Sequence, residues 1–248
     1  MSPPLAGLPG HPPALWRKPG GGGPVPWSPE AMLPYAIHWM DETTSLSEST
    51  WSCRATYSRG DLGAPPEGGT FGVSSLNGLR STVMNDAYSG YGCAIAYTEY
   101  GDTPNYLTGE LDIWMVGRMN TVGYREPVFR LDGVPSSAGV RVNSYETNYF
   151  RLEADGTPHN VAVGISYQNR WTLYRMGVRE GQMFVDVDGV RLDDKVLTLG
   201  GFFNFRCCVA QHGSSAQWDI AEVLMCRPVP ESWAQAFTSY LMTKWGLV

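Results

Sequence analysis

The sequence predicts an all-β protein: a two-sheet antiparallel jelly-roll sandwich with one short C-terminal α-helix and an extended N-terminal arm. Nine Trp, 13 Tyr and 29 Gly, with only 17% charged residues, are typical of many strands joined by tight turns. Short strand candidates separated by Asn-Gly and Asp-Gly dipeptides run through the chain from Thr70 onward, and apolar residues recur at three- and four-residue intervals near its end. With 248 residues, of which 43% are hydrophobic, the chain can bury the core of one sandwich domain.

Residues 1–34 have a different composition from the rest. They hold ten of the 18 prolines and six glycines, which exclude a regular helix or a central strand and favour an extended, polyproline-like backbone. One interpretation is a disordered tail. The alternative is an arm that becomes ordered against a neighbouring molecule, because a solvated tail has little use for two tryptophans and several leucines. We expect residues 35–248 to form the jelly-roll domain, and residues 1–34 to be an assembly arm that makes contacts through Leu15, Trp16, Val25 and Trp27.

The domain is expected to consist of short strands. The strand candidates are Thr70–Leu76, Arg80–Met84, Tyr91–Thr98, Leu107–Met119, Arg125–Leu131, Val140–Asn143, Tyr149–Leu152, Asn160–Ser166, Trp171–Gly177, Met183–Val187, Val196–Leu199, Phe202–Ala210 and Gln217–Met225. Dipeptides that accept the positive φ angles of hairpin turns lie between them, at Asn77-Gly78, Asp132-Gly133, Asp155-Gly156 and Asp188-Gly189. The prolines and glycines of Asp61–Gly69 predict a loop.

The last 32 residues contain the clearest change of period. Apolar residues alternate along Gln217–Met225, with a local break near Glu222, so this stretch is predicted to be a strand. After Pro228 and Pro230 a helix is expected, which ends at Gly246 in a left-handed conformation. One face of this helix is apolar and must lie on a sheet; its residues are Trp233, Phe237, Tyr240, Leu241 and Trp245.

This C-terminal stretch carries a family resemblance. A strand reading WDIAEVL, a proline-bearing turn and a helix that ends in YLMTKWGL resemble the C-terminal signature of concanavalin A-like, laminin-G-type jelly-roll domains, especially those of bacteriophage structural proteins. Trp171–Gly189 resembles the same family's pair of strands that ends in an Asp-Gly turn, and YAIHWMDETTSL resembles the opening of phage jelly-roll proteins. The matching positions are Ile220, Ala221, Glu222, Val223, Tyr240, Leu241, Lys244, Trp245, Gly246 and Leu247. The resemblance implies the jelly-roll fold and a structural role in a virion, in capsid decoration or as a tail or spike component.

Charge and hydropathy exclude several classes of function. A net charge of −6 without any basic stripe argues against nucleic-acid binding, which needs clustered Lys and Arg. No apolar run approaches the length of a membrane span, and the N-terminus lacks the apolar region of a secretory signal. We therefore expect the chain to be made and assembled in a cytoplasm, and the resemblance to phage proteins implies localisation in the virion.

Catalytic motifs are not found in the sequence, so neither an enzyme nor a cofactor is expected. The five cysteines lack metal-binding spacing and are expected to be buried, reduced thiols. His38 is expected to be a packed strand histidine. The stretch GELDIWM resembles the catalytic strand of retaining β-glucanases, and Glu110 and Asp112 match its first two acidic positions. The third is apolar, at Trp114 or Met115, so the second carboxylate that retaining hydrolysis needs is missing. We expect Glu110 and Asp112 to be outward residues of an ordinary strand.

Two groups of residues are candidates for binding. Asp186 and Asp188 share a strand face and are weak candidates for calcium, with Asp193 and Asp194 as helpers, although calcium needs more oxygen ligands than these supply. Tyrosines among Gly, Asn and Asp form a candidate patch for stacking on sugar rings or for protein contacts, composed of Tyr88, Tyr91, Tyr97, Tyr100 and Tyr106.

Three hypotheses for function follow. The first is a structural protein of a phage or phage-like particle, present as a homo-oligomer or in many copies of an assembly, docked on capsid or tail proteins through its arm and able to adhere to a host-surface glycan. The second is a carbohydrate-binding lectin module. The third is an atypical glycoside hydrolase.

Overall fold

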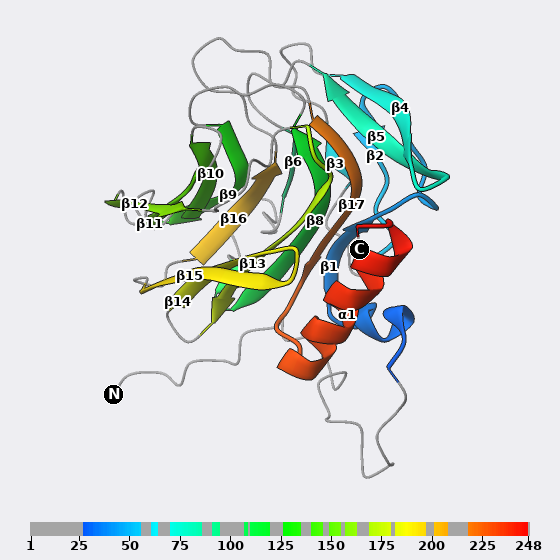
Figure 1. Cartoon of the computed structure of the whole chain (residues 1–248). Coiled ribbons are helices and arrows are strands. Elements are labelled where there is room, and N and C mark those ends of the chain that lie inside the picture. Colours follow the sequence, from blue (N-terminus) through cyan, green and yellow to red (C-terminus); the bar gives the residue numbers. More distant parts are fainter. Residues whose placement is uncertain are drawn as a thin grey trace, which may run out of the picture.

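A computed structural model of the chain describes residues 27–55, 61–63, 70–85, 91–94, 107–108, 110–119, 126–134, 140–145, 149–154, 157–162, 169–179, 182–196, 201–207 and 218–247. Two antiparallel sheets and one C-terminal helix make up this part of the chain, which confirms the predicted all-β class. One sheet lies between the helix and the other sheet (Figure 1). The described residues include no helix that is both long and apolar enough to cross a bilayer.

The sheet under the helix, which we call sheet A, is organised around its last strand. Strand β17 pairs with β8 on one edge; its other edge pairs first with β5, along Trp218–Ile220, and then with β1, along Val223–Cys226. A register shift between Ile220 and Glu222 marks the change of partner, and it confirms the break that the sequence predicts near Glu222. In sheet order the strands are β15 (Val190–Val196), β14 (Gln182–Val187), β13 (Thr172–Arg179), β8 (Leu111–Met119), β17 (Trp218–Cys226), β5 (Leu79–Asn85) and β4 (Thr70–Leu76), with β1 (Ala36–Met40) on β17.

The second sheet, sheet B, covers the opposite face of sheet A. Strand β17 is buried at every position, and so is β8 from Leu111 to Gly117. This burial is expected for strands that are covered on both faces. The strands of sheet B are, in order, β12 (Thr157–Ala162), β11 (Tyr149–Ala154), β10 (Val140–Tyr145), β9 (Glu126–Val134), β16 (Gly201–Cys207), β6 (Tyr91–Ala94), β3 (Leu62–Gly63) and β2 (Thr50–Trp51), with β7 (Leu107–Thr108) on β16.

Helix α1 (Glu231–Lys244) follows the predicted pattern. Phe237, Leu241 and Trp245 are completely buried, while Trp233 and Tyr240 are half-buried at the edges of the apolar face. The ring of Phe237 stands edge-on to two sheet residues, Trp39 at 5.7 Å and Trp114 at 5.3 Å between ring centroids. The chain leaves the helix through Gly246 at φ +64°, and the amide of Leu247 donates to the carbonyl of Met242.

The end of the predicted arm packs on this helix. Pro29–Met32 form a short 3₁₀ turn, which the composition did not predict. Met32 is completely buried, and the ring of Trp27 lies 6.2 Å from that of Tyr240. Residues from Trp27 onward therefore contribute to the hydrophobic cluster of the domain. Leu15, Trp16 and Val25 lie outside the described residues.

Two of the predicted hairpin turns have the positive φ angles that the sequence indicates. Asn77-Gly78 and Asp188-Gly189 have φ values of 50° and 75°, and of 49° and 79°, as in type I′ hairpin turns. Pairing of Ala154 with Thr157 confirms the hairpin predicted around the Asp155-Gly156 dipeptide, which itself is not described.

Two local predictions are wrong, and one strand starts earlier than predicted. Asp132-Gly133 lies inside β9, where these residues pair with β16, so a dipeptide that suits a turn is overridden by strand pairing. Strand β15 starts directly after the Asp188-Gly189 turn and shares only Val196 with the predicted strand Val196–Leu199, whose other residues lie outside the described part of the chain. Leu62–Gly63, predicted as part of a loop, form the short strand β3.

Candidate functional site

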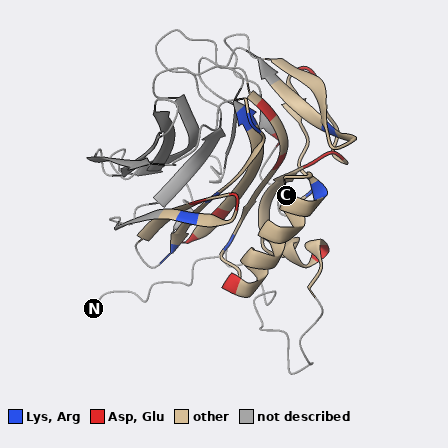
Figure 2. Cartoon of the chain, viewed as in Figure 1, with Lys and Arg blue, Asp and Glu red and all other residues tan. Residues whose placement is uncertain are grey.

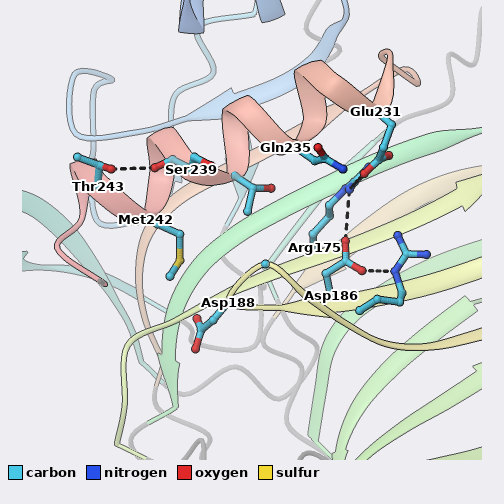
Figure 3. A pocket seen from close by; sticks show the side chains of 11 residues that line it. Arg175, Asp186, Asp188, Glu231, Gln235, Ser239, Met242 and Thr243 are labelled. Atoms are coloured by element: carbon cyan, nitrogen blue, oxygen red, sulfur yellow. Dashed lines mark hydrogen bonds and ion pairs between the residues drawn. The ribbon is translucent and has the colours of Figure 1, made fainter.

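A polar groove separates helix α1 from the hairpin of β14 and β15 (Figure 3). It has a volume of about 540 Å³ and is open to solvent. Its floor comes from sheet A, one wall from the helix and the other from the turn between the two strands. The lining residues are Arg175, Asp186, Asp188, Gly189, Arg191, Glu231, Gln235, Thr238, Ser239, Met242 and Thr243.

The helix wall follows from helical periodicity. Because Phe237 and Leu241 face the sheet, the residues one step around the helix face the hairpin, and they are mostly hydrogen-bonding residues. Gln235 and Ser239 are exposed one turn apart. Thr238 is fixed in place, since its hydroxyl accepts a hydrogen bond from the indole of Trp114 at 3.1 Å. The wall therefore offers an amide and several hydroxyls, with Met242 as an apolar contact.

The floor of the groove is built around the guanidinium of Arg175, whose side chain is 4% exposed. It donates to both carboxylate oxygens of Glu231 in the first turn of α1, at 2.9 and 3.0 Å. It also reaches Asp186 at 3.3 Å and Asp112 at 3.3 Å. One buried cation thus joins strands β8, β13 and β14 to the helix.

Further arginines complete this charged cluster. Arg179 pairs with Asp112 and, at 3.3 Å, with Glu231. Arg191 pairs with Asp186. Hydrogen bonds from Arg175 lower the pKa of Glu231 below its ordinary value. Burial raises the pKa of the Asp112 carboxyl, and the two arginines act in the opposite direction.

Aromatic packing holds the guanidinium groups in place. The guanidinium carbon of Arg191 lies 3.8 Å from the ring centroid of Phe184, and that of Arg175 lies 4.9 Å from it. Gly177 makes room for this ring, because a Cβ at that position would lie 2.0 Å from Cζ of Phe184. The same Cβ would lie 2.8 Å from a carboxylate oxygen of Asp112. The glycine is therefore required by the close packing of the cluster.

The other wall contains the predicted calcium candidates. Asp188 occupies the turn, where its carboxylate accepts from the amide of Leu173 at 2.9 Å and pairs with Arg170. Asp186 is held by Arg175 and Arg191. A calcium ion would have to displace these arginines. Among the residues that the structure describes, no three metal-ligating side chains come together, and the side chains of Asp193 and Asp194 are not described.

The structure corrects the prediction for Asp112. Its carboxylate is completely buried under the helix, whereas we expected it to be outward-facing. Glu110 precedes β8 and is half-buried. Asp112 is engaged by two arginines and has no access to solvent, so these two residues do not form a hydrolytic pair.

The remaining predicted site residues can be placed only in part. Tyr91 begins β6, where its side chain is not described, and Tyr88, Tyr97, Tyr100 and Tyr106 lie outside the described residues. His38 is completely buried in β1, as predicted. Cys53 and Cys226 are free thiols; Cys226 is buried, as predicted, whereas Cys53 is only half-buried. Burial raises the pKa of Cys226 well above its ordinary value.

A second polar cluster lies at the other end of α1. The buried carboxylate of Glu222 accepts hydrogen bonds from the indoles of Trp39 at 2.7 Å and Trp245 at 2.9 Å, and from Lys244 at 2.7 Å. Burial opposes the positive charge of Lys244, but Glu222 and Glu42 outweigh it and raise the pKa of Lys244. Figure 2 shows the charged residues of the helix itself: an acidic residue lies at its start, a basic residue lies at its end, and the residues between them are uncharged.

Sequence reasoning missed the arginines and Glu231. A signal was present, because Arg175, Gly177 and Arg179 alternate along one strand and must share a face. The acidic partners come from positions 63 and 56 residues away, and no local pattern connects them.

The chain matches no protein-family model, and no curated protein matches its sequence. Its fold resembles several solved structures at low sequence identity. The binding domain of paraclostridial mosquitocidal protein 1 has a TM-score of 0.58 at 9% identity over 84% of this chain and 53% of that one. The Trypanosoma rangeli sialidase, solved with sialic acid, has a TM-score of 0.59 at 14% identity over 85% of this chain and 33% of that one. An alginate lyase of polysaccharide lyase family 7 has a TM-score of 0.52 at 8% identity over 78% of this chain and 95% of that one. The chain thus spans about half of the first structure and a third of the second. These likenesses confirm the jelly-roll-like β-sandwich.

Proposed function

We propose that this chain is a non-catalytic carbohydrate-binding module that holds an oligosaccharide in the groove between α1 and the β14–β15 hairpin. The groove itself carries the proposal. It combines an exposed amide, several hydroxyls and one apolar contact over a floor of fixed guanidinium groups. Its volume of about 540 Å³ is in the range of small-molecule sites. Sugar hydroxyls both donate and accept hydrogen bonds, so they suit such a lining.

Similar solved structures are consistent with this proposal. The sialidase and the alginate lyase both act on carbohydrates, as their names state. Their β-sandwiches resemble this chain in fold, and they lend support to carbohydrate recognition without identifying a sugar.

The absence of catalysis is part of the proposal. Of the acidic pair that resembles a glucanase strand, Asp112 is buried between two arginines and cannot reach a substrate. The other carboxylates at the groove are likewise bound to arginine. Carboxylates held in this way are poor nucleophiles and poor proton donors, so binding without hydrolysis is the role that we assign to the groove. No cofactor is required for it.

We further propose that the module works on a phage or phage-like particle, in many copies, where it adheres to a host-surface glycan. The support is the resemblance of its C-terminal strand and helix to phage jelly-roll proteins. Residues 1–26 would dock on a capsid or tail protein, with Leu15, Trp16 and Val25 as the apolar contacts. Trp27 already packs on the chain's own Tyr240, so the anchoring function is assigned to the residues before it.

A glycan array followed by calorimetry tests carbohydrate binding. Gln235→Ala/Ser239→Ala removes two exposed hydrogen-bonding groups of the groove, and we expect the Kd to rise about tenfold, because each lost hydrogen bond costs about 0.5–1.5 kcal/mol. Ser232→Ala is the matched control, since Ser232 is exposed on the same helix and does not line the groove. If Tyr97→Ala or Tyr106→Ala abolishes binding and the groove variant does not change it, the tyrosine patch is the site and the groove is not.

A further inference from the structure

We infer that the groove selects uncharged oligosaccharides over acidic ones, and that Glu231 is the residue that sets this selectivity. The inference rests on the proposed carbohydrate-binding function and specifies its ligand class. It follows from the pairing of charges along the floor and the rim of the groove.

Positive and negative groups are balanced at the groove. Four arginines pair with four carboxylates: Arg170 with Asp188, Arg175 with Asp112, Asp186 and Glu231, Arg179 with Asp112 and Glu231, and Arg191 with Asp186. Every one of these cations thus has a protein anion as its partner. A sialic or uronic acid needs a cation whose fork is available to its carboxylate.

The fork of Arg175 is fully used. Both of its terminal nitrogens bind Glu231 in the bidentate arrangement that would otherwise receive a ligand carboxylate. If an acidic sugar displaced Glu231, a protein anion in the rim would face a ligand anion. If it drew Arg175 away from Asp112, a completely buried carboxylate would lose a partner, which is strongly unfavourable. Neutral sugars meet neither obstacle, because they bind through hydroxyl groups.

Glu231 is the carboxylate of the cluster that prevents an acidic sugar from binding Arg175. Its side chain is 47% exposed at the start of the helix, whereas the side chains of Asp112 and Asp186 are 0% and 9% exposed. Replacing Glu231 with Gln keeps the size and one acceptor oxygen, and it removes the anion that occupies Arg175. The substitution leaves Arg175 with its partners Asp112 and Asp186 but without an anion on the groove side, so an acidic sugar no longer meets a protein carboxylate there.

Paired ligands test the inference on the full-length protein. A neutral oligosaccharide and the same oligosaccharide carrying a terminal sialic or uronic acid are titrated into wild type, Glu231→Gln and Glu48→Gln. The last variant changes net charge equally at an exposed site beside β4, where the carbonyl of Glu48 accepts from Phe71. We expect wild type and Glu48→Gln to bind the neutral ligand at least about tenfold more tightly than the acidic one, and Glu231→Gln to narrow that ratio by at least about threefold.

The outcomes separate this inference from the proposed function. Tighter binding of the acidic ligand by wild type would overturn the selectivity while leaving carbohydrate binding intact. If Glu231→Gln and Glu48→Gln show the same ratio of neutral-ligand to acidic-ligand affinity, Glu231 does not determine the selectivity. If wild type binds neither ligand series, the proposed function itself fails, and the inference fails with it.

Discussion

A carboxylate pairs with cationic side chains at each end of helix α1, and the two carboxylates differ in their exposure to solvent. At its C-terminal end, the carboxylate of Glu222 lies 1% exposed and receives two indole N–H groups and Lys244. At its N-terminal end, Glu231 bridges Arg175 and Arg179 beside an open groove. The first carboxylate is sealed and completely engaged, while the second is half in solvent.

This difference shows which ion pair anchors the helix and which can meet a ligand. A charge that is removed from water depends on every partner it has, so the Glu222 cluster fixes where the helix ends on the sheet. A charge that remains half solvated contributes less to stability, and its solvent-facing side can contact a ligand. The helix is therefore held at one end and available for recognition at the other.

The largest expected effect is a contrast between the two glutamates. Glu222→Ala leaves two buried indole N–H groups without their acceptor and Lys244 with Glu42 alone, so we expect a loss of about 3–5 kcal/mol in the free energy of unfolding. Glu231→Ala should cost less, about 1–2 kcal/mol, because Glu231 is half exposed and the buried guanidinium of Arg175 keeps Asp112 and Asp186 as partners. Denaturant titrations of both variants measure the contrast, and equal losses would mean that the two ends do not differ as described.

The second prediction concerns the N-terminal segment that lies along the helix. Met32 is completely buried in the cluster under α1, so Met32→Ala should lower the free energy of unfolding by about 2–5 kcal/mol. Deletion of residues 1–26 should leave that free energy unchanged, whereas deletion of residues 1–34 should lower it at least as much as Met32→Ala. A deletion of residues 1–34 with wild-type stability would contradict the packing of Met32 and Trp27.

The smallest expected effect distinguishes two buried glycines of sheet A. Gly177→Ala forces the ring of Phe184 away from Arg175 and Asp112, and we expect a cost of about 1–3 kcal/mol together with weaker ligand binding. Gly117→Ala is the matched control, because its new Cβ would lie 3.3 Å from the flexible end of Met115 and outside the charged cluster. If Gly117→Ala costs as much stability and affinity as Gly177→Ala, the groove does not depend on this packing.

Sequence patterns predicted the elements better than the site. The apolar face of α1, the break near Glu222 and the turns at Asn77-Gly78 and Asp188-Gly189 all depend on neighbouring residues, and the structure confirms each of them. The turn expected at Asp132-Gly133 is wrong because pairing with β16 extends the strand through it.

The candidate site was harder to predict because its parts come from distant strands. Asp186 and Asp188 were recognised as a pair, but their arginine partners were not. Asp112 was expected to face outward, since strand alternation identifies two faces without saying which one a later helix covers.

Local periodicity and backbone freedom by themselves determined that this chain forms many strands, hairpin turns and one terminal amphipathic helix. Only the tertiary structure decided that β17 lies between β8 and two partners on its other edge, and that Asp112, Arg175 and Glu231 meet under the start of that helix. The physical reason is that sheet order and buried ion pairs depend on contacts between residues far apart in the chain, and such contacts leave no periodic trace in the sequence.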